Sequence, residues 1–189
     1  SEIVKTITYS INKTKLPEKI FFLQISTDQV YSGEGPHKEN FTKPINVYSK
    51  TKLNGEKYLK RINGCAIRTN FLGKPLQSDK KGLCDWIYRS LKKNKSITVF
   101  KNVRFSPLSI KSLCKYIQII INKKIPGIFN LGSKNGLSKA EFALLFAKKL
   151  KLNVKLLKVA DYKKEHLIAK RPLDMRMNIK LFEKKFKIK

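Results

Sequence analysis

The sequence has few of the residues that build metal centres, disulfide frameworks or membrane spans. Its 189 residues include three cysteines and two histidines, which are widely spaced and form no Cys-x-x-Cys pair. Neither a disulfide framework nor a metal site is therefore predicted. No apolar run approaches the ~20 residues of a membrane-spanning helix, and no secretory signal pattern is present. We expect a cytoplasmic protein with reduced thiols and no membrane partner.

Acidic residues are also scarce, with 13 against 42 basic ones and a formal net charge of +29. Such an excess invites a nucleic-acid function, because phosphate neutralisation dominates that kind of binding. The lysines, however, are scattered from Lys5 to Lys189 rather than gathered in one stripe or one helix. We therefore predict solvated lysine surfaces and no nucleic-acid partner. The positive field still favours anionic ligands such as dinucleotides and nucleotide-sugars.

What is present is an alternation of helical and strand patterns in a chain with an ordinary hydrophobic fraction of 41%. This alternation predicts an α/β fold with a mostly parallel sheet. Ser138 followed by Glu141 predicts a capping box at the start of one helix. The predicted helices cover residues 1–14, 46–61, 82–93, 109–122, 139–150 and 179–185, the strands 19–26, 65–72, 96–101 and 127–132, and the loops 30–44, 73–81 and 103–107.

The most informative motif is Tyr48 followed four residues later by Lys52. Residues four apart share one face of a helix, so the Lys52 ammonium can lie beside the Tyr48 phenol and favour its ionised form. A phenol with an ordinary pKa of ~10 exchanges protons poorly at neutral pH. A nearby cation lowers that pKa toward neutrality. The pair is thus a candidate general acid and base for reducing a ketone. A surface helix that carries both residues by chance is the alternative.

The context of the motif supports the catalytic interpretation. Ser26-Thr27-Asp28 follows a short apolar strand, and ligands bind at the carboxyl ends of strands in open α/β sheets. Thr27 offers a hydroxyl that could hold a substrate carbonyl, although it could also simply cap a turn. The hydride for such a reduction would come from a nicotinamide cofactor.

A dinucleotide-binding sheet needs a Gly-x-Gly-x-x-Gly turn between its first strand and first helix. Gly33-Glu34-Gly35 leads into Pro36 and His37 rather than a helix, and no other segment matches. We therefore interpret the chain as the carboxyl-terminal part of a larger protein. Without the remaining part, the chain should bind NAD(P)H poorly.

Several segments resemble one known family in order along the chain. Residues 25–33, Ile-Ser-Thr-Asp-Gln-Val-Tyr-Ser-Gly, are similar to a Ser-Thr-Asp-x-Val-aromatic-x-Gly motif, and residues 44–56 to a Pro-x-x-x-Tyr-x-x-x-Lys-x-x-x-Glu helix. Residues 68–71, 127–143 and 171–178 match later landmarks. The family is that of dTDP-4-dehydrorhamnose reductases, within the extended short-chain dehydrogenases/reductases.

The resemblance implies catalytic roles for three residues. Thr27 would hydrogen-bond the substrate carbonyl, Tyr48 would donate the proton, and Lys52 would support Tyr48. Tyr48 and Lys52 would also contact the nicotinamide ribose, and the backbone at Ile25 would face the nicotinamide end of NADPH or NADH. Residues that choose between the two cofactors lie after the second strand of the preceding part.

The resemblance also implies substrate contacts. Asp28 and Phe71 would lie along the sugar, as would the Thr27 hydroxyl, although Asp28 could instead cap a turn and Phe71 could belong to the core. Gln29 stands where close relatives often carry an aromatic residue, which would alter the sugar accepted. Arg68 is expected to be a structural ion-pair partner, and Arg104 is a weaker candidate for a nucleotide phosphate contact.

Taken together, these features predict the carboxyl-terminal part of a Rossmann-like parallel sheet plus a small α/β substrate-binding domain. Residues 1–72 would carry the catalytic Thr, Tyr and Lys, and residues 73–189 mainly the substrate-binding part, with some segments returning to the sheet. The expected activity is NADPH-dependent reduction of a nucleotide-linked 4-keto-6-deoxy sugar, in the supply of deoxysugars for surface polysaccharide.

Two alternatives to this activity stay open. The first is a nucleotide-sugar epimerase or dehydratase of the same superfamily. The second is a non-catalytic, nucleotide-binding regulatory module. The partner in every case is a nucleotide-linked sugar or a similar ligand, and a homodimer is one option for the assembly.

Overall fold

The central strand of the fold, β2 (Gly64–Leu72), is buried along its first six residues. A computed structural model describes residues 2–14, 20–73, 82–163 and 170–188. In it β2 pairs in parallel with β1 (Phe22–Ile25), β6 (Gly127–Leu131) and β5 (Pro107–Ser109). The buried part of β2 includes apolar Cys65, Ala66 and Ile67 and continues with the polar residues Arg68 and Thr69, which are buried as well.

The register brings the carboxyl ends of these strands together. Ile25 lies opposite Ile67, Thr69 opposite Leu131, and Asn70 opposite Pro107. The residues that follow β1 therefore lie beside the carboxyl-terminal part of β2. This edge of the sheet is where a ligand is expected in an open α/β fold.

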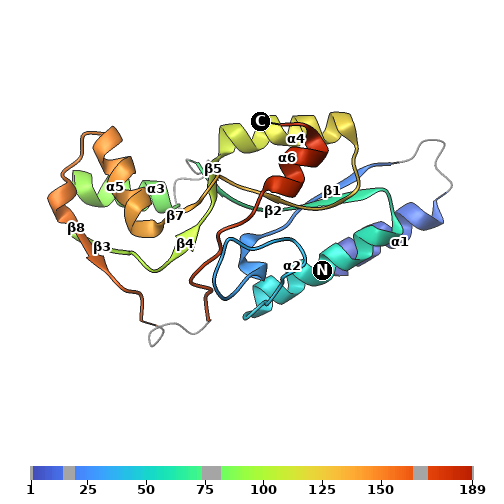
Figure 1. Cartoon of the computed structure of the whole chain (residues 1–189), viewed down its shortest axis with the longest axis horizontal. Coiled ribbons are helices and arrows are strands. Elements are labelled where there is room, and N and C mark those ends of the chain that lie inside the picture. The colour runs from blue at the N-terminus through green and yellow to red at the C-terminus, as the bar shows by residue number, and fades with distance from the viewer. Residues whose placement is uncertain (1, 15–19, 74–81, 164–169, 189) are drawn as a thin grey trace.

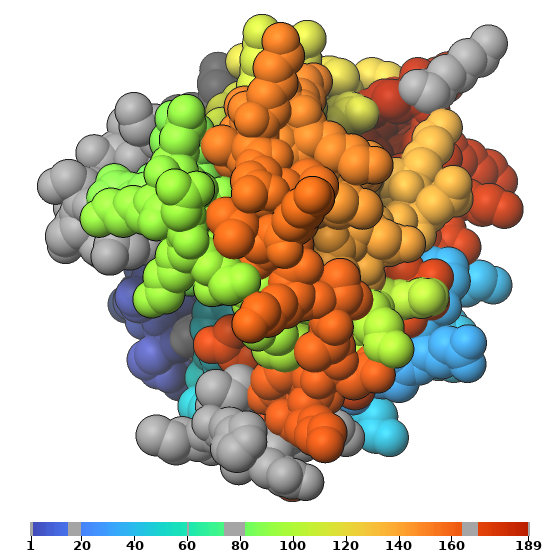
Figure 2. All heavy atoms as spheres, turned by 90° about the vertical axis from the view of Figure 1, so that its left-hand side faces the viewer, coloured from blue at the N-terminus to red at the C-terminus, as the bar shows by residue number. Residues whose placement is uncertain are grey.

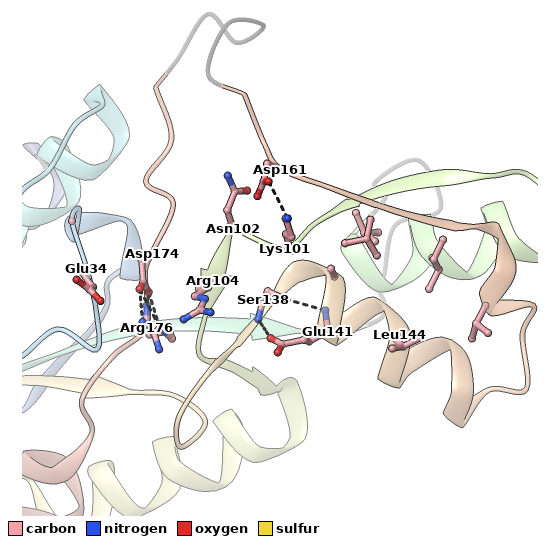
Figure 3. A pocket seen from close by; sticks show the side chains of 16 residues that line it. Glu34, Lys101, Asn102, Arg104, Ser138, Glu141, Leu144, Asp161, Asp174 and Arg176 are labelled. Atoms are coloured by element: carbon pink, nitrogen blue, oxygen red, sulfur yellow. Dashed lines mark hydrogen bonds and ion pairs between the residues drawn. The ribbon is translucent and has the colours of Figure 1, made fainter.

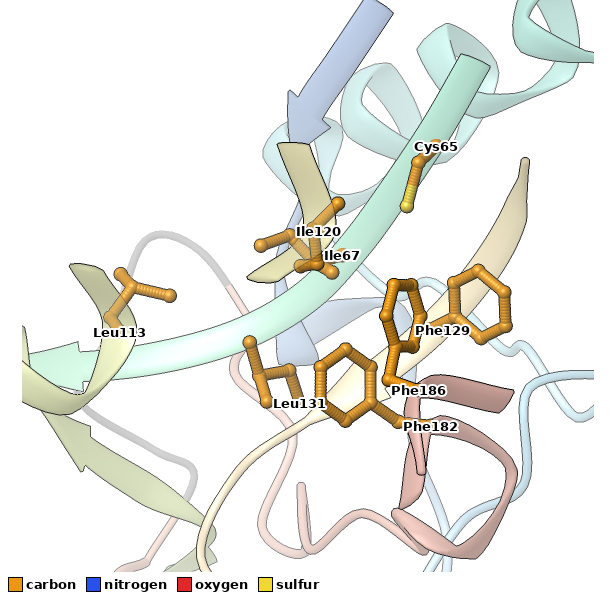
Figure 4. Close-up of a cluster of buried hydrophobic side chains, with 8 residues drawn as sticks. All are labelled: Cys65, Ile67, Leu113, Ile120, Phe129, Leu131, Phe182 and Phe186. Atoms are coloured by element: carbon orange, nitrogen blue, oxygen red, sulfur yellow. The ribbon is translucent and has the colours of Figure 1, made fainter. Parts of the chain in front are cut away.

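Helices cover both faces of the sheet (Figure 1). α1 (Glu2–Lys13) and α2 (Val47–Tyr58) lie together on one face, and α4 (Ile110–Lys123) and α6 (Lys180–Phe186) lie on the other. A buried hydrophobic cluster fills the space between the sheet and the second pair (Figure 4). Its members are Cys65, Ile67, Leu113, Ile120, Phe129, Leu131, Phe182 and Phe186.

The position of α2 is fixed at its start and along its length. Asn46 and Ser49 form a reciprocal capping box that satisfies free backbone groups at the helix start. Further along, a Cβ atom on Gly55 would come within 2.9 Å of Gln24 Nε2. A larger residue would require the flexible Gln24 side chain to shift, so glycine lets α2 pack closely on β1 without that adjustment. The 3₁₀ turn η2 (Leu59–Arg61) then leads into β2.

A second lobe lies beside the carboxyl-terminal end of β2. Two parallel strands, β3 and β8, pair with each other, and helices α3 and α5 share a second hydrophobic core with them. Figure 2 shows the outer face of this lobe, with residues of α3 and β3 beside those of α5 and β8. The elements are α3 (Leu83–Lys92), β3 (Ile97–Phe100), α5 (Lys139–Lys149), η3 (Val154–Leu156) and β8 (Leu157–Ala160).

The predicted α/β class with a mostly parallel sheet is confirmed, as is the capping box of Ser138 and Glu141. The predicted loop over residues 103–107 is wrong in part. It contains β4 (Arg104–Phe105), which pairs antiparallel with β7 (Leu137–Ser138). β5, β7 and β8 were not predicted either. The loop predicted over residues 73–81 lies outside the described residues, apart from Gly73. No helix in the described part of the chain is long and apolar enough to cross a membrane.

Candidate functional site

The face of α2 that carries Tyr48 and Lys52 lies against the end of β1. Lys52 Nζ donates a hydrogen bond of 2.5 Å to the backbone carbonyl of Ile25. Tyr48, one turn earlier on the same face, is 51% exposed, and its phenol hydroxyl makes no hydrogen bond within the described part of the chain. The ammonium is thus fixed beside the sheet edge, and the phenol is accessible to a ligand.

Thr27 and Asp28 follow β1 in a short 3₁₀ turn, η1 (Asp28–Val30). The Thr27 hydroxyl oxygen accepts a hydrogen bond from the Gln29 backbone N–H over 3.3 Å, which caps this turn. The hydroxyl also donates to Asp28 Oδ1 over a long 3.4 Å. Thr27 therefore caps the turn, which was one of the two roles considered for it. Because its hydroxyl donates only a long hydrogen bond, the hydroxyl hydrogen can still turn to another acceptor.

Asp28 is almost fully buried and is held from β2. Asn70 Nδ2 donates to Asp28 Oδ2 over 2.8 Å. Burial raises the pKa of Asp28 to about 6, whereas the Asn70 hydrogen bond and the charge of Lys139 act in the opposite direction. A carboxyl group that gains a proton near neutral pH therefore lies at the carboxyl edge of the sheet. Phe71, the next residue of β2, is half exposed and lies opposite Leu108 of β5.

A buried polar network ties α2 to β1 and β2. Arg68 Nη2 and Glu56 Oε2 form an ion pair of 2.6 Å, so the expected structural role of Arg68 is confirmed. Ser26 donates to Glu56 Oε1 over 2.5 Å, and Arg68 Nη1 donates to the Tyr31 hydroxyl over 2.8 Å. Buried charges are tolerated when they are paired and hydrogen-bonded in this way. Glu56 lies two turns after Tyr48, so the network fixes the helix that carries the candidate catalytic residues.

The network continues into distant parts of the chain. The Tyr31 hydroxyl donates to Asn130 Oδ1 over 2.6 Å, and Asn130 Nδ2 donates to the carbonyls of His37 and Asn178. The rings of Tyr31 and His37 stack with centroids 4.9 Å apart. Burial raises the pKa of Tyr31 to about 12, so this phenol remains protonated and structural. Loop and C-terminal segments are thereby held against the sheet edge.

A cavity of about 480 Å³ adjoins this edge. Gln29 and Asn70 line it from the side of the main sheet, and Lys139 lines it from the start of α5. Trp86 and Arg171 are further lining residues, from α3 and from the C-terminal segment. The cavity therefore lies between the two lobes, with aromatic and cationic side chains in its wall, next to the Thr27 to Asp28 turn.

A larger cavity of about 780 Å³ lies between the lobes at another place. Asp174 and Arg176 pair at one end of it, the capping box of α5 lies at another, and Arg104 lies between them (Figure 3). Several of its charges are already paired, and its lining does not include Gln29 or Asn70. The smaller cavity is therefore the better candidate for a substrate site, through Gln29 and Asn70, and its lining does not include Thr27, Tyr48 or Lys52. Arg104 lines the larger cavity and not the smaller one, which weakens its suggested role at a nucleotide phosphate.

The structure thus joins the predicted site residues in two groups. Lys52 contacts Ile25, and Thr27 contacts Asp28, while Tyr48 and Phe71 remain half exposed. Sequence reasoning missed two further groups, Lys139 and the bond from Asn70 to Asp28. Asn70 could have been found, because it belongs to residues 68–71, Arg-Thr-Asn-Phe, which match a landmark of the resembled family. Lys139 could not have been found, because it is one of many lysines and is not itself a motif residue.

A parallel sheet with helices on both faces, and with Tyr and Lys one turn apart on a helix beside its carboxyl edge, defines a fold of the short-chain dehydrogenase/reductase type. Solved structures agree. A hypothetical dTDP-4-dehydrorhamnose reductase from Sulfolobus tokodaii is 29% identical with a TM-score of 0.82, over 97% of this chain and 63% of that one. The enzyme of that name from Bacillus anthracis, solved with NADP, is 22% identical with a TM-score of 0.77, over 86% and 58%.

A dTDP-glucose 4,6-dehydratase from Streptomyces venezuelae, solved with NAD, shares the fold at 16% identity and a TM-score of 0.76, over 98% of this chain and 59% of that one. A comparison with curated protein sequences found no match. The chain belongs to the family described as RmlD substrate binding domain, whose sequence model matches residues 5–189. The predicted resemblance to dTDP-4-dehydrorhamnose reductases is therefore confirmed. The chain spans about three-fifths of the length of these solved relatives.

Proposed function

We propose that this chain supplies the catalytic residues and the substrate pocket of an NADPH- or NADH-dependent reductase of a nucleotide-linked 4-keto-6-deoxy sugar. Such an enzyme would serve deoxysugar supply for surface polysaccharide. The observation that carries the proposal is the hydrogen bond that fixes Lys52 to the Ile25 carbonyl, with the exposed Tyr48 phenol one turn away. Residues 1–72 would hold the reacting groups, and the lobe after them would hold most of the substrate.

The residues present fit the nicotinamide end of a dinucleotide. The Lys52 ammonium has three donor hydrogens, and its bond to Ile25 uses one of them. The others could bind ribose hydroxyls, with the exposed Tyr48 hydroxyl beside them. The bound cofactor would supply the hydride. The printed sequence contains no phosphate-binding glycine turn, so these residues account for the nicotinamide end alone.

Each reacting group has a role that its surroundings support. The Thr27 hydroxyl, weakly bound to Asp28, can turn its hydrogen to the keto oxygen of the sugar. Tyr48 would then give its phenolic proton to that oxygen as the carbonyl is reduced, and the positive charge of Lys52 would favour the phenolate left behind. Asp28, held by Asn70, would accept hydrogen bonds from sugar hydroxyls.

The cavity lined by Gln29 and Asn70 suits a nucleotide-linked substrate. Aromatic side chains such as Trp86 can pack on a base, and the cationic Arg171 suits phosphate oxygens. The cavity volume of about 480 Å³ lies within the range of small-molecule sites. The family to which the chain belongs and the names of its solved relatives point to the same class of substrate.

The test is a reduction assay on the full-length protein that contains this chain. Oxidation of NADPH is followed with a dTDP-linked 4-keto-6-deoxy sugar, for the unsubstituted protein and for Tyr48→Phe. We expect turnover to fall by about 10²- to 10⁴-fold, the usual contribution of a general acid, with cofactor affinity preserved. Tyr58→Phe, at the other end of α2, is the matched control and should retain full turnover. Unchanged turnover in Tyr48→Phe would remove Tyr48 from the mechanism.

A second candidate is a dehydratase or epimerase of the same superfamily. Asp28 favours it, because burial raises the pKa of this carboxyl to about 6 and makes it able to donate a proton near neutral pH. The absence of a second acid at Gln29 disfavours a dehydratase. The assay separates the candidates, since a reductase consumes one reduced cofactor per product, whereas the other activities show no net consumption. A regulatory module would bind the nucleotide-sugar and leave it unchanged.

A further inference from the structure

Lys139, the first residue of α5, extends into the smaller cavity without an ionic partner. Its Nζ atom lies 3.4 Å from the centroid of the Phe105 ring. Within the described residues, no carboxylate lies at ion-pair distance from it, and it donates no side-chain hydrogen bond. A cation over an aromatic face is held in place, but its hydrogen-bond donors remain unused.

The surroundings of Lys139 disfavour its positive charge. Burial, and to a smaller extent the charge of Arg171 in the same cavity, lower the pKa of Lys139 to about 8, although Asp28 and Cys84 act in the opposite direction. Its place in the first turn of α5 also opposes the helix dipole, which favours anions at this end. On balance, the charge of Lys139 is therefore less favourable in the folded protein than in water.

The start of α5 does not itself call for a ligand. The Glu141 carboxylate accepts a hydrogen bond from the Ser138 backbone N–H, and the Ser138 hydroxyl accepts one from the Glu141 N–H. The side chain of Lys139, and not the helix terminus, is thus the group that requires a partner. Two cations, Lys139 and Arg171, share a cavity whose other lining residues, among those that the structure describes, include no carboxylate.

We infer that Lys139 binds the diphosphate of the substrate and so sets specificity for nucleotide-linked over free sugars. This inference rests on the proposed function. The sugar of such a substrate is neutral, so its diphosphate is the anion available to a cationic side chain. Asn70, which holds Asp28, lines the same cavity as Lys139 and Arg171. With the sugar beside Asn70, the diphosphate would lie against the two cations.

The test measures binding to the full-length protein by calorimetry, with dTDP as the probe and without cofactor or keto sugar. Lys139→Met keeps an apolar stem and removes the charge. We expect it to weaken dTDP binding by roughly 10- to 100-fold, the range for one charge-assisted hydrogen bond. Lys139→Arg should restore most of the affinity. Lys134→Met, which removes an exposed lysine paired with Glu183, is the matched control and should bind dTDP normally.

Proton uptake gives a second readout that a purely structural role would not change. At pH 8.5 a lysine with a pKa of about 8 is mostly neutral, so binding a diphosphate should take up roughly three-quarters of a proton. At pH 7 the uptake should nearly vanish. Asp28, Cys84 and Arg171 are the charged or titratable groups that act on Lys139, and they are unchanged in the variants. Lys139→Arg should show no uptake at either pH.

Two results would overturn the inference. One is dTDP binding by Lys139→Met within threefold of the unsubstituted protein, and the other is failure of the unsubstituted protein to bind dTDP. Thermal unfolding of Lys139→Met checks that the variant is folded, and Lys139→Gln repeats the test if it is not. Because no turnover is measured, Lys139-dependent binding without ketone reduction would refute the proposed reductase and leave this inference standing.

Discussion

The buried ion pair between Glu56 and Arg68 allows a quantitative stability prediction. The Arg68 and Glu56 side chains are 3% and 1% exposed. Arg68→Met would leave the Glu56 carboxylate buried with the Ser26 hydroxyl as its remaining hydrogen-bond donor among the described residues. Removing one partner of a buried pair costs about 3–5 kcal/mol. Since total stabilities are about 5–15 kcal/mol, this variant should lose about a fifth or more of its free energy of unfolding.

The measurement is urea unfolding followed by circular dichroism at neutral pH. Lys101→Met is the control, because it removes an exposed pair with Asp161 whose side chains are 62% and 52% exposed. That variant should lose less than about 1 kcal/mol.

A double variant tests the cause of the loss. Glu56→Gln keeps an acceptor for Ser26 but has no charge, so Glu56→Gln combined with Arg68→Met should be more stable than Arg68→Met alone. The reasoning is refuted if Arg68→Met loses less than about 1 kcal/mol. It is equally refuted if the double variant is no more stable than Arg68→Met.

Two further predictions concern Asp28 and the capping box of α5. Because burial raises the pKa of Asp28 from 3.8 to about 6, ionising this carboxyl opposes folding as pH rises from about 4 through 6. Asp28→Asn keeps an acceptor for Asn70, so its stability advantage should grow between pH 4 and pH 7 by on the order of 2 kcal/mol, and a constant difference in urea unfolding would contradict this. Ser138→Ala removes the hydroxyl that accepts from Glu141 N–H and should cost about 1 kcal/mol in thermal unfolding. Ser133→Ala, which removes a buried hydroxyl without a partner in the described part, should cost less, and equal losses would argue against the cap.

The long elements could be predicted from the sequence because their patterns are local. α4 and α5 carry apolar residues at helical spacing, and the short apolar run Cys65-Ala66-Ile67 marks the start of the buried strand β2. The missed strands are short. β4 and β7 have two residues each, and their pairing joins Arg104 to Ser138 across a long separation. No local pattern encodes such a pair.

The site residues could also be predicted only where a local sequence pattern marks them. Thr27, Tyr48 and Lys52 were found because their spacing along the chain has a chemical meaning. The groups that act on Asp28 could not be found in this way, because its hydrogen-bond donor Asn70 is 42 residues away and Lys139, whose charge lowers its pKa, lies in the other lobe. Arg68 was expected to form an ion pair, but the identity of Glu56 as its partner depends on how α2 packs on the sheet.

The Tyr31 to Asn130 hydrogen bond also constrains the order of events during synthesis. The two residues are 99 positions apart, and Asn130 in turn binds the carbonyl of Asn178. A ribosome that has released residues 1–72 has therefore exposed both Tyr31 and Arg68 but not yet Asn130. Since buried polar groups require their partners, the first part of the chain cannot complete its packing at that stage. The hydrogen-bond network that holds the catalytic helix is thus complete only after both Asn130 and Asn178 have been made.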